Sequence, residues 1–372
     1  MKATSLLTVG AMLTVLGASA AVAEDIKLAV VGPMTGSQAA IGEELRRGAE
    51  KAVADLNAAG GVMGQKLNLI VGDDACDPKQ AVSVANDVAS QQVVFIDGHY
   101  CSGSSIPASA VYNEAGILQM SPGSTNPALT DDAAAKGWTN VYRTVGRDDA
   151  QGKVAGEYLA TEYKGKAIAI IDDKSAYGKG IADETRKTLQ AAGGKEVIDE
   201  QITAGDRDFS ALISKLKAAH VEVIYFGGYE VEGGLIAKQA RDQKLDATLI
   251  GGDALLTQQF YNVSGPAGDG TLMTFAPDPR KVPAAKKVVE SFKKDGYEPE
   301  GYTLYSYATI QIFAAAVEAA KSTKLEDLTK VLQSGRTFDT VIGPIQFDKK
   351  GDIVNPAFVF YKWQGGSYAE LD

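Results

Sequence analysis

The sequence contains few of the residues from which metal sites and redox centres are built. Its 372 residues include only two cysteines, Cys76 and Cys101, and two histidines, His99 and His220. A structural zinc site would need all four, and their spacing does not fit one. Runs of basic residues are also missing. With 37 Lys and Arg against 47 Asp and Glu, the net charge of -10 disfavours binding to nucleic acid. We therefore expect neither a metal nor a nucleic-acid partner.

Long apolar runs are absent too, apart from a short one near the N-terminus. It follows Lys2, covers roughly residues 6–16, and falls short of the about 20 apolar residues that span a bilayer. The triplet Ala21-Val22-Ala23 supplies the small residues of a cleavage site. We predict that residues 1–23 are a signal peptide cleaved after Ala23, and that the mature protein is exported to a periplasm. The alternative is an N-terminal membrane anchor.

Each of the two cysteines follows a short apolar run, at residues 67–71 and 93–96. If these runs are neighbouring parallel strands, Cys76 and Cys101 lie in loops at the same edge of a sheet. An oxidising compartment then favours a disulfide. The alternative is a pair of free buried thiols. A Cys-x-x-Cys pair of the kind that redox catalysis uses is not present.

Short apolar runs alternate with helical segments along most of the chain, which predicts an α/β fold. The runs are continuously apolar, as in parallel strands that are covered on both faces. The pattern begins near Ile26 and restarts after Arg143. Length and pattern together predict two similar lobes, followed by a largely helical tail that returns to the first.

Ligands of open α/β sheets bind beyond the carboxyl ends of the strands, so the loops that follow the predicted strands are informative. These loops carry Gly, Ser, Thr, Tyr and acidic residues, without clusters of Lys or Arg. Neither a G-x-x-x-x-G-K-[ST] loop nor a G-x-G-x-x-G after a strand is present. We therefore expect no nucleotide and no other cofactor.

The sequence resembles the periplasmic leucine/isoleucine/valine-binding proteins, which are the substrate-binding components of branched-chain amino-acid ABC transporters. The resemblance covers nearly the whole mature chain, and its motifs are specific in combination. It rests on residues 73–82 (DDACDPKQAV), 98–102 (GHYCS), 173–178, 226–229 (FGGY), 343–344 and 348–352 (DKKGD).

This resemblance implies a type I periplasmic binding fold, in which two Rossmann-like lobes enclose a ligand cleft. Three crossovers would fall near residues 142–144, 271–275 and 348–353. The implied lobe 1 comprises residues 24–143 plus 273–350, and lobe 2 comprises residues 144–272 plus 351–372. The resemblance also implies the Cys76–Cys101 disulfide.

The implied ligand is an aliphatic amino acid, a zwitterion with a carboxylate and an ammonium group. Ser102 and Thr125 would bind the carboxylate at a helix N-terminus. Asp253, where most relatives have Glu, would bind the ammonium with the Gly123 carbonyl and the Thr125 hydroxyl, and Ser124 between them is also expected to bind the ligand. Tyr229 would reach the carboxylate from lobe 2, and Tyr177 would cradle the side chain. Each of these residues could instead be a helix cap, a turn residue or a packing residue.

Three positions differ in size from their counterparts in the leucine-binding relatives. Tyr100 stands where they have leucine, Tyr302 where they have phenylalanine, and Ile41 where they have tyrosine. We expect the Tyr100 ring to narrow the pocket, which favours small ligands such as valine, alanine, proline or a short ω-amino acid over leucine. The alternative is that Ile41 restores the space and the branched-chain range survives.

The predicted function is therefore non-catalytic capture of an amino acid for an inner-membrane ABC permease, by a monomer. An exported hydrolase using Ser102 or Ser124 is one alternative, but no G-x-S-x-G elbow surrounds either serine. A sensor domain on the same fold is the other. We expect His99 and His220 to be structural, and Asp73 and Asp74 to order the disulfide loop.

Overall fold

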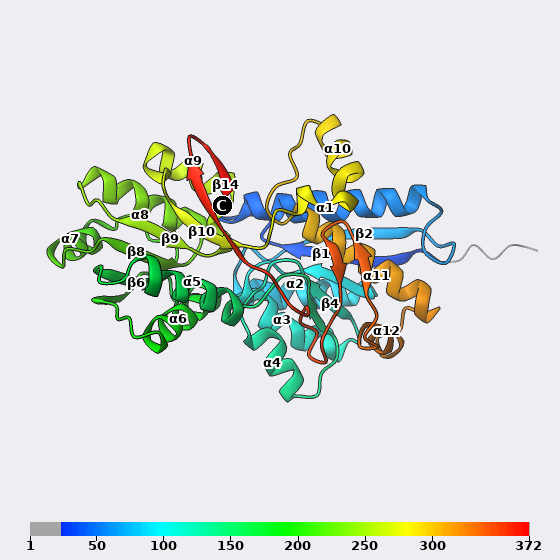
Figure 1. Ribbon diagram of the computed structural model, residues 1–372. Helices are drawn as coiled ribbons and strands as arrows, with labels where there is room; N and C mark the ends of the chain where they lie inside the picture. The colour runs from blue at the N-terminus through cyan, green and yellow to red at the C-terminus, as the bar shows by residue number, and fades with distance from the viewer. Residues whose placement is uncertain (1–23, 372) are drawn as a thin grey trace, which may run out of the picture.

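The computed structural model describes residues 24–371, so the predicted signal peptide lies outside the described residues. Two sheets flanked by helices form two lobes that lie side by side (Figure 1). The predicted two-lobed α/β fold is thus confirmed. A separate two-stranded ribbon, Phe338–Thr340 (β11) with Gly343–Ile345 (β12), adds to the first lobe's side.

The first sheet has the strand order β2-β1-β3-β4-β5, and all its neighbouring strands are parallel. Its inner strands are buried at every residue or nearly so, which explains their continuously apolar sequences, whereas the edge strand β2 is partly exposed. The strands are Ile26–Gly32 (β1), Leu67–Asp73 (β2), Phe95–Gly98 (β3), Leu118–Ser121 (β4) and Val141–Arg143 (β5).

The helices of the first lobe come from both ends of the chain. Ser306 of α11 donates a hydrogen bond to the Leu45 carbonyl of α1 at 2.7 Å, so the returning tail packs on the first helix. The helices are Ala39–Ala58 (α1), Pro78–Ser90 (α2), Ser102–Glu114 (α3), Ala128–Ala135 (α4), Lys286–Lys294 (α10), Thr303–Ala320 (α11) and Leu325–Leu332 (α12).

The second sheet has the order β14-β13-β10-β9-β8-β6-β7. Its strands are parallel except at one edge, where β13 and β14 are added antiparallel. The strands are Ile168–Asp172 (β6), Ile198–Gln201 (β7), Val223–Gly227 (β8), Thr248–Gly251 (β9), Leu272–Phe275 (β10), Val359–Gln364 (β13) and Ser367–Glu370 (β14). The helices are Asp148–Glu162 (α5), Ala176–Ala191 (α6), Ser210–Ala218 (α7), Glu230–Asp242 (α8) and Gln258–Ser264 (α9).

The chain passes between the two sheets three times. The first passage follows β5 and the third precedes β13, close to the predicted positions. The second was predicted at residues 271–275, but β10 belongs to the second sheet, so this passage follows Phe275. We therefore propose that the boundary of lobe 2 lies after Phe275 rather than at residue 272.

Several helices begin about one turn earlier than their apolar periodicity predicts. The apolar periodicity of these segments begins near residues 43, 106, 181 and 234, whereas α1, α3, α6 and α8 begin at Ala39, Ser102, Ala176 and Glu230. The first turns of α3, α6 and α8 are rich in Ser, Gly or acidic residues, which are typical of loops. The segments after the strands are consequently short, and several predicted site residues lie in or next to the first turn of a helix.

None of the helices between residues 24 and 371 is long and apolar enough to cross a membrane.

Candidate functional site

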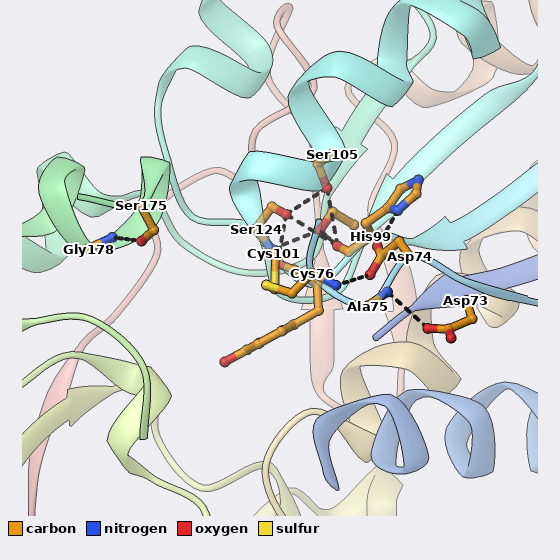
Figure 2. Close-up of a disulfide and its surroundings, with 12 residues drawn as sticks. Asp73, Asp74, Ala75, Cys76, His99, Cys101, Ser105, Ser124, Ser175 and Gly178 are labelled. Atoms are coloured by element: carbon orange, nitrogen blue, oxygen red, sulfur yellow. Dashed lines mark hydrogen bonds and ion pairs between the residues drawn. A yellow bond between two sulfur atoms is a disulfide. The ribbon is translucent and has the colours of Figure 1, made fainter. Parts of the chain in front are cut away.

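The disulfide joins two loops at the carboxyl edge of the first sheet (Figure 2). Cys76 and Cys101 are bonded, with their Cα atoms 5.6 Å apart, which confirms the predicted pairing. The premise that their strands are neighbours was wrong, because β1 lies between β2 and β3. The bond forms because both loops converge above the end of β1.

Two aspartates order the disulfide loop. The backbone N–H of Cys76 donates to Asp74 Oδ1 at 2.8 Å, and that of Ala75 donates to Asp73 Oδ1 at 2.9 Å. The other Asp74 oxygen lies 2.5 Å from His99 Nδ1, while His99 Nε2 lies 2.9 Å from the Tyr112 hydroxyl. Both His99 ring nitrogens therefore have partners within lobe 1. Residues 24–371 hold no group of three His, Cys, Asp or Glu side chains suited to a metal ion.

The disulfide places Ser102 at the start of α3. Cys101 is the residue before the helix, and Ser102 is its first residue. The first N–H groups of a helix have no partner within it, so this end of α3 presents hydrogen-bond donors and a partial positive charge. Ser102 is buried, and its hydroxyl accepts a hydrogen bond from the Asn126 backbone N–H at 3.3 Å.

Thr125 belongs to the loop after β4 and completes the polar edge of lobe 1. Its side chain is buried, and the Oγ1 atom forms no hydrogen bond of ordinary geometry among the described residues, although the Asp148 carboxylate lies near it. A buried hydroxyl without a partner is unfavourable, so this atom is suited to a ligand. The N-terminus of α3 and the Thr125 hydroxyl together can bind a carboxylate.

Gly123 and Ser124 both contact residues inside lobe 1, Gly123 by close packing and Ser124 by hydrogen bonds. A Cβ atom at Gly123 would lie 2.5 Å from a ring carbon of Tyr100, so the ring requires glycine there. The Ser124 hydroxyl bonds the Ser105 hydroxyl at 2.7 Å and the Tyr100 carbonyl at 2.8 Å (Figure 2). This hydroxyl is engaged inside the lobe and holds the loop rather than facing lobe 2.

A fully buried arginine donates hydrogen bonds to the backbone of the same loop. Arg143, at the end of β5, donates to the Ser124 carbonyl at 2.8 Å and to the Asn126 carbonyl at 3.1 Å. It also forms an ion pair with Asp352 of the third passage at 2.8 Å. The loop that carries Thr125 is thereby attached to two of the three segments that join the lobes.

Lobe 2 supplies a buried carboxylate, Asp253, just after β9. One oxygen accepts hydrogen bonds from the Tyr177 hydroxyl at 3.0 Å and Gln151 Nε2 at 3.1 Å. The other accepts one from the Tyr302 hydroxyl of lobe 1 at 2.5 Å. Within residues 24–371, Asp253 has no ion pair with Lys, Arg or His.

Burial raises the pKa of Asp253, and the bonds from Tyr302, Tyr177 and Gln151 act in the opposite direction. All three donors are neutral, so they stabilise the charge without cancelling it. A buried carboxylate of this kind is best satisfied by a cation. The arrangement can therefore bind an ammonium group at Asp253.

Four tyrosines surround this centre. Tyr177 lies in the first turn of α6, Tyr229 directly precedes α8, and both come from lobe 2. Their ring centroids are 5.2 Å apart, and Tyr229 lies 6.0 Å from Tyr100 of lobe 1. Tyr100 in turn contacts Tyr302 edge-on at 4.9 Å. These rings come from both lobes and pack together in the interface.

Ile41 is less closely tied to this centre than the other predicted residues. It lies in the first turn of α1 and is fully buried in the same apolar cluster as Tyr100 and Tyr302. The hydrogen bonds around Asp253 do not involve it.

Two residues of α5 are part of the site but were not predicted. Gln151 is fully buried, and besides Asp253 it donates to the Thr274 carbonyl at 2.9 Å. Asp148 is fully buried near the Thr125 hydroxyl; burial raises the pKa of Asp148 strongly, and the Thr125 hydroxyl acts in the opposite direction. Their polarity in the first turn of a helix after a strand was the available signal.

A cavity of about 210 Å³ adjoins the centre on the side of the passages between the lobes. Thr125, Gln151 and Asp253 form part of its wall, and most of the remaining wall is apolar. Residues from all three passages line it, among them Val145, Ala276 and Ile353. The polar centre therefore lies next to the segments that must bend if the lobes move.

The arrangement needed for serine hydrolysis is not formed. The His99 ring is paired with Asp74 and Tyr112, and contacts neither Ser102 nor Ser124. The other histidine, His220, follows α7, away from both serines in the sequence. No nucleophile–base pair therefore exists at these two serines.

The family model described as periplasmic binding protein matches residues 25–367. The chain belongs to this family. Its members bind substrates for transporters and are not enzymes, and they are periplasmic proteins. The chain is 46% identical over 343 residues to a Leu/Ile/Val-binding protein homolog 1 of Brucella suis, covering 92% of this chain and 91% of that protein. It is 45% identical to an amino acid binding protein of Pseudomonas aeruginosa, covering 97% and 96%.

Solved structures agree with this assignment. A leucine binding protein of Thermotoga maritima superimposes with a TM-score of 0.86 at 26% identity, covering 93% of this chain and 98% of that one. The branched-chain amino acid transporter substrate binding protein LivJ of Streptococcus pneumoniae, in complex with isoleucine, gives 0.83 at 27% identity and covers 93% and 100%. The resemblance noted from the sequence motifs is confirmed.

Proposed function

We propose that this protein captures an aliphatic amino acid of the Leu/Ile/Val class between its lobes and delivers it to an ABC transporter. The observation that carries the proposal is the pairing of opposite polarities across the interface. Lobe 1 offers the N-terminus of α3, and lobe 2 offers the buried, unneutralised Asp253. A zwitterion satisfies both. The names of the relatives in Brucella and Pseudomonas support the same class of ligand.

Each end of the ligand has partners in this proposal. Ser102 and Thr125 bind the carboxylate, with Tyr229 completing the set from lobe 2. Asp253 binds the ammonium, together with the Gly123 carbonyl and the Thr125 hydroxyl. Because each end of the ligand draws partners from both lobes, both ends are satisfied only when the lobes are closed.

The ligand's side chain would meet a wall of tyrosines. Tyr100 and Tyr302 are almost fully buried and contact one another, and Tyr302 also reaches Asp253 with its hydroxyl. A phenylalanine at position 302 could not form that bond. We propose that these rings restrict the side chain, and that valine, alanine, proline or a short ω-amino acid binds better than leucine.

Competition calorimetry with purified protein tests the ligand range. We expect valine and proline to displace leucine, with differences of about 1–3 kcal/mol, which is the range for a methylene in an apolar pocket. Tighter binding of leucine than of both would contradict the narrowed pocket but not amino-acid capture. If none of the twenty amino acids raised the melting temperature, the proposed function itself would be wrong.

The remaining proposals concern the protein's surroundings. We propose that the mature chain begins at Glu24 after export, that it acts as a monomer, and that its partner is an inner-membrane permease of the branched-chain amino-acid type. Mass spectrometry of periplasmic material would identify the first residue.

A further inference from the structure

A second contact between the lobes lies apart from Asp253. Gln38 precedes α1 in lobe 1, and Glu230 is the first residue of α8 in lobe 2. The Gln38 side-chain amide lies against the Glu230 carboxylate, and in the amide orientation that satisfies its surroundings the nitrogen donates to both Glu230 oxygens, at 2.8 and 2.7 Å. Gln38 is 3% exposed and Glu230 is 0% exposed, so the lobes bury this bond between them.

The pair lies by the interlobe groove, which has a volume of about 660 Å³. Ser37, Gln38 and the Cys76–Cys101 disulfide line this groove from lobe 1, and Tyr229 and Glu232 line it from lobe 2. The Asp253 centre forms no hydrogen bond with Gln38 or Glu230. The contact is thus not bonded to Asp253, although Glu230 directly follows Tyr229 in the chain.

The charges around Glu230 make its burial costly. Glu44 faces it from α1 and Glu232 from its own helix, and the hydroxyls of Tyr100 and Tyr229 are also near. Glu230 has no ion pair among the described residues, and burial raises its pKa to about 8. A buried carboxylate with only acidic neighbours needs hydrogen-bond donors, and Gln38 supplies them.

We propose that Gln38 and Glu230 form a latch, an affinity-determining contact between the lobes that the ligand does not touch. The bond requires the lobes to meet, so its free energy adds to the closing equilibrium and hence to the observed affinity. The proposal rests on the proposed function in one respect, namely that ligand binding and lobe closure occur together.

Removing one partner differs from removing both. Above about pH 8, where Glu230 is ionised, Gln38→Ala buries the carboxylate on closure without its donor, so affinity falls by about tenfold or more, as for a lost bond to a charged group. In Glu230→Ala the costly carboxylate is gone, and we expect a loss of only about threefold, because no charge is stranded. Gln38→Ala/Glu230→Ala therefore binds more tightly than Gln38→Ala alone.

The experiment measures dissociation constants for valine and proline with the three variants and with a matched control, Gln258→Ala, an exposed glutamine confined to lobe 2. Closure of ligand-free protein is followed by energy transfer between fluorophores on Glu290→Cys and Asp246→Cys, exposed positions in different lobes. We expect unchanged affinity in the control and a smaller closed fraction in Gln38→Ala.

The pH supplies a readout that loss of packing alone would not move. Protonation removes the stranded charge in Gln38→Ala, since every titratable group facing Glu230 is acidic. With the closed-state pKa of Glu230 raised to about 8, the defect should be larger at pH 9 than at pH 6. Glu230→Ala should lose this dependence.

Equal affinities in Gln38→Ala and the control, or no rescue in the double variant, would overturn the latch. Failure of the proposed function looks different, because then no variant binds an amino acid. The closed fraction of ligand-free protein still tests the latch in that case: it is overturned if Gln38→Ala closes as often as the parent chain.

Discussion

The two lobes have similar architectures but present opposite chemistry to each other. Lobe 1 offers the N-terminus of α3 and a loop fixed by the disulfide and by Arg143. Lobe 2 offers Asp253, which the side chains of Tyr177 and Gln151 hold by hydrogen bonds and which no disulfide among the described residues fixes. The difference indicates that the donor side is rigidified through its backbone, whereas the acidic side is tuned through neutral hydrogen bonds. Each lobe is thereby suited to one end of a zwitterion.

The substitution Asp253→Asn tests the role of the carboxylate that lobe 2 presents to lobe 1. The substitution removes the charge while keeping the size, so amino-acid binding should weaken by about 2–5 kcal/mol, the range for truncating one member of a buried charge pair. Calorimetry measures the loss. Asp246→Asn is the control, because that acid is fully exposed in the same lobe. Unchanged affinity in Asp253→Asn would mean that dipoles alone hold the ammonium.

The double variant Cys76→Ser/Cys101→Ser removes the disulfide of lobe 1. A loop of 25 residues should contribute about 3–4 kcal/mol to the free energy of unfolding in the chain-entropy model. Urea unfolding of both proteins measures this difference. The parent chain under reducing conditions should match the double variant, and an identical unfolding midpoint in all three samples would show that the disulfide leaves stability unaffected.

The substitution Ser102→Ala tests the hydrogen-bond donors that lobe 1 presents at the N-terminus of α3. One hydrogen bond to the ligand carboxylate should be lost, which weakens binding by about 1.5 kcal/mol. The effect is smaller than for Asp253 because the backbone N–H groups of α3 remain. Ser214→Ala, an exposed serine of α7, is the control. A loss equal to that of Asp253→Asn would show that the backbone donors contribute little.

The fold was predictable from the sequence because its signals are local and repeated. Buried parallel strands need apolar residues on both faces, so strands such as β6 and β8 stand out as continuous runs. The pairing of Cys76 with Cys101 could also be anticipated, although the strand order could not. Register and order depend on contacts between distant segments, and β1 lying between β2 and β3 leaves no local trace.

The site was predictable only in part. Ser102, Thr125, Tyr177, Tyr229 and Asp253 follow strands, and the structure places them at the lobe interface. Gln151 and Asp148 were missed because neither directly follows a strand, and nothing in the local sequence shows that the first turn of α5 meets Asp253. The Gln38–Glu230 contact could not be predicted from the sequence, because it depends on how the two lobes are placed relative to each other, which no single segment determines.

The three passages between the sheets also determine when the molecule can finish folding. The Ser306–Leu45 bond joins residues 261 apart in sequence, and β13 and β14 complete the second sheet only near the end of the chain. A chain truncated before α11 would leave α1 uncovered and the β10 edge open to other chains. Long-range pairings of this kind form slowly. Neither lobe can therefore complete itself until nearly the whole of the described chain is available.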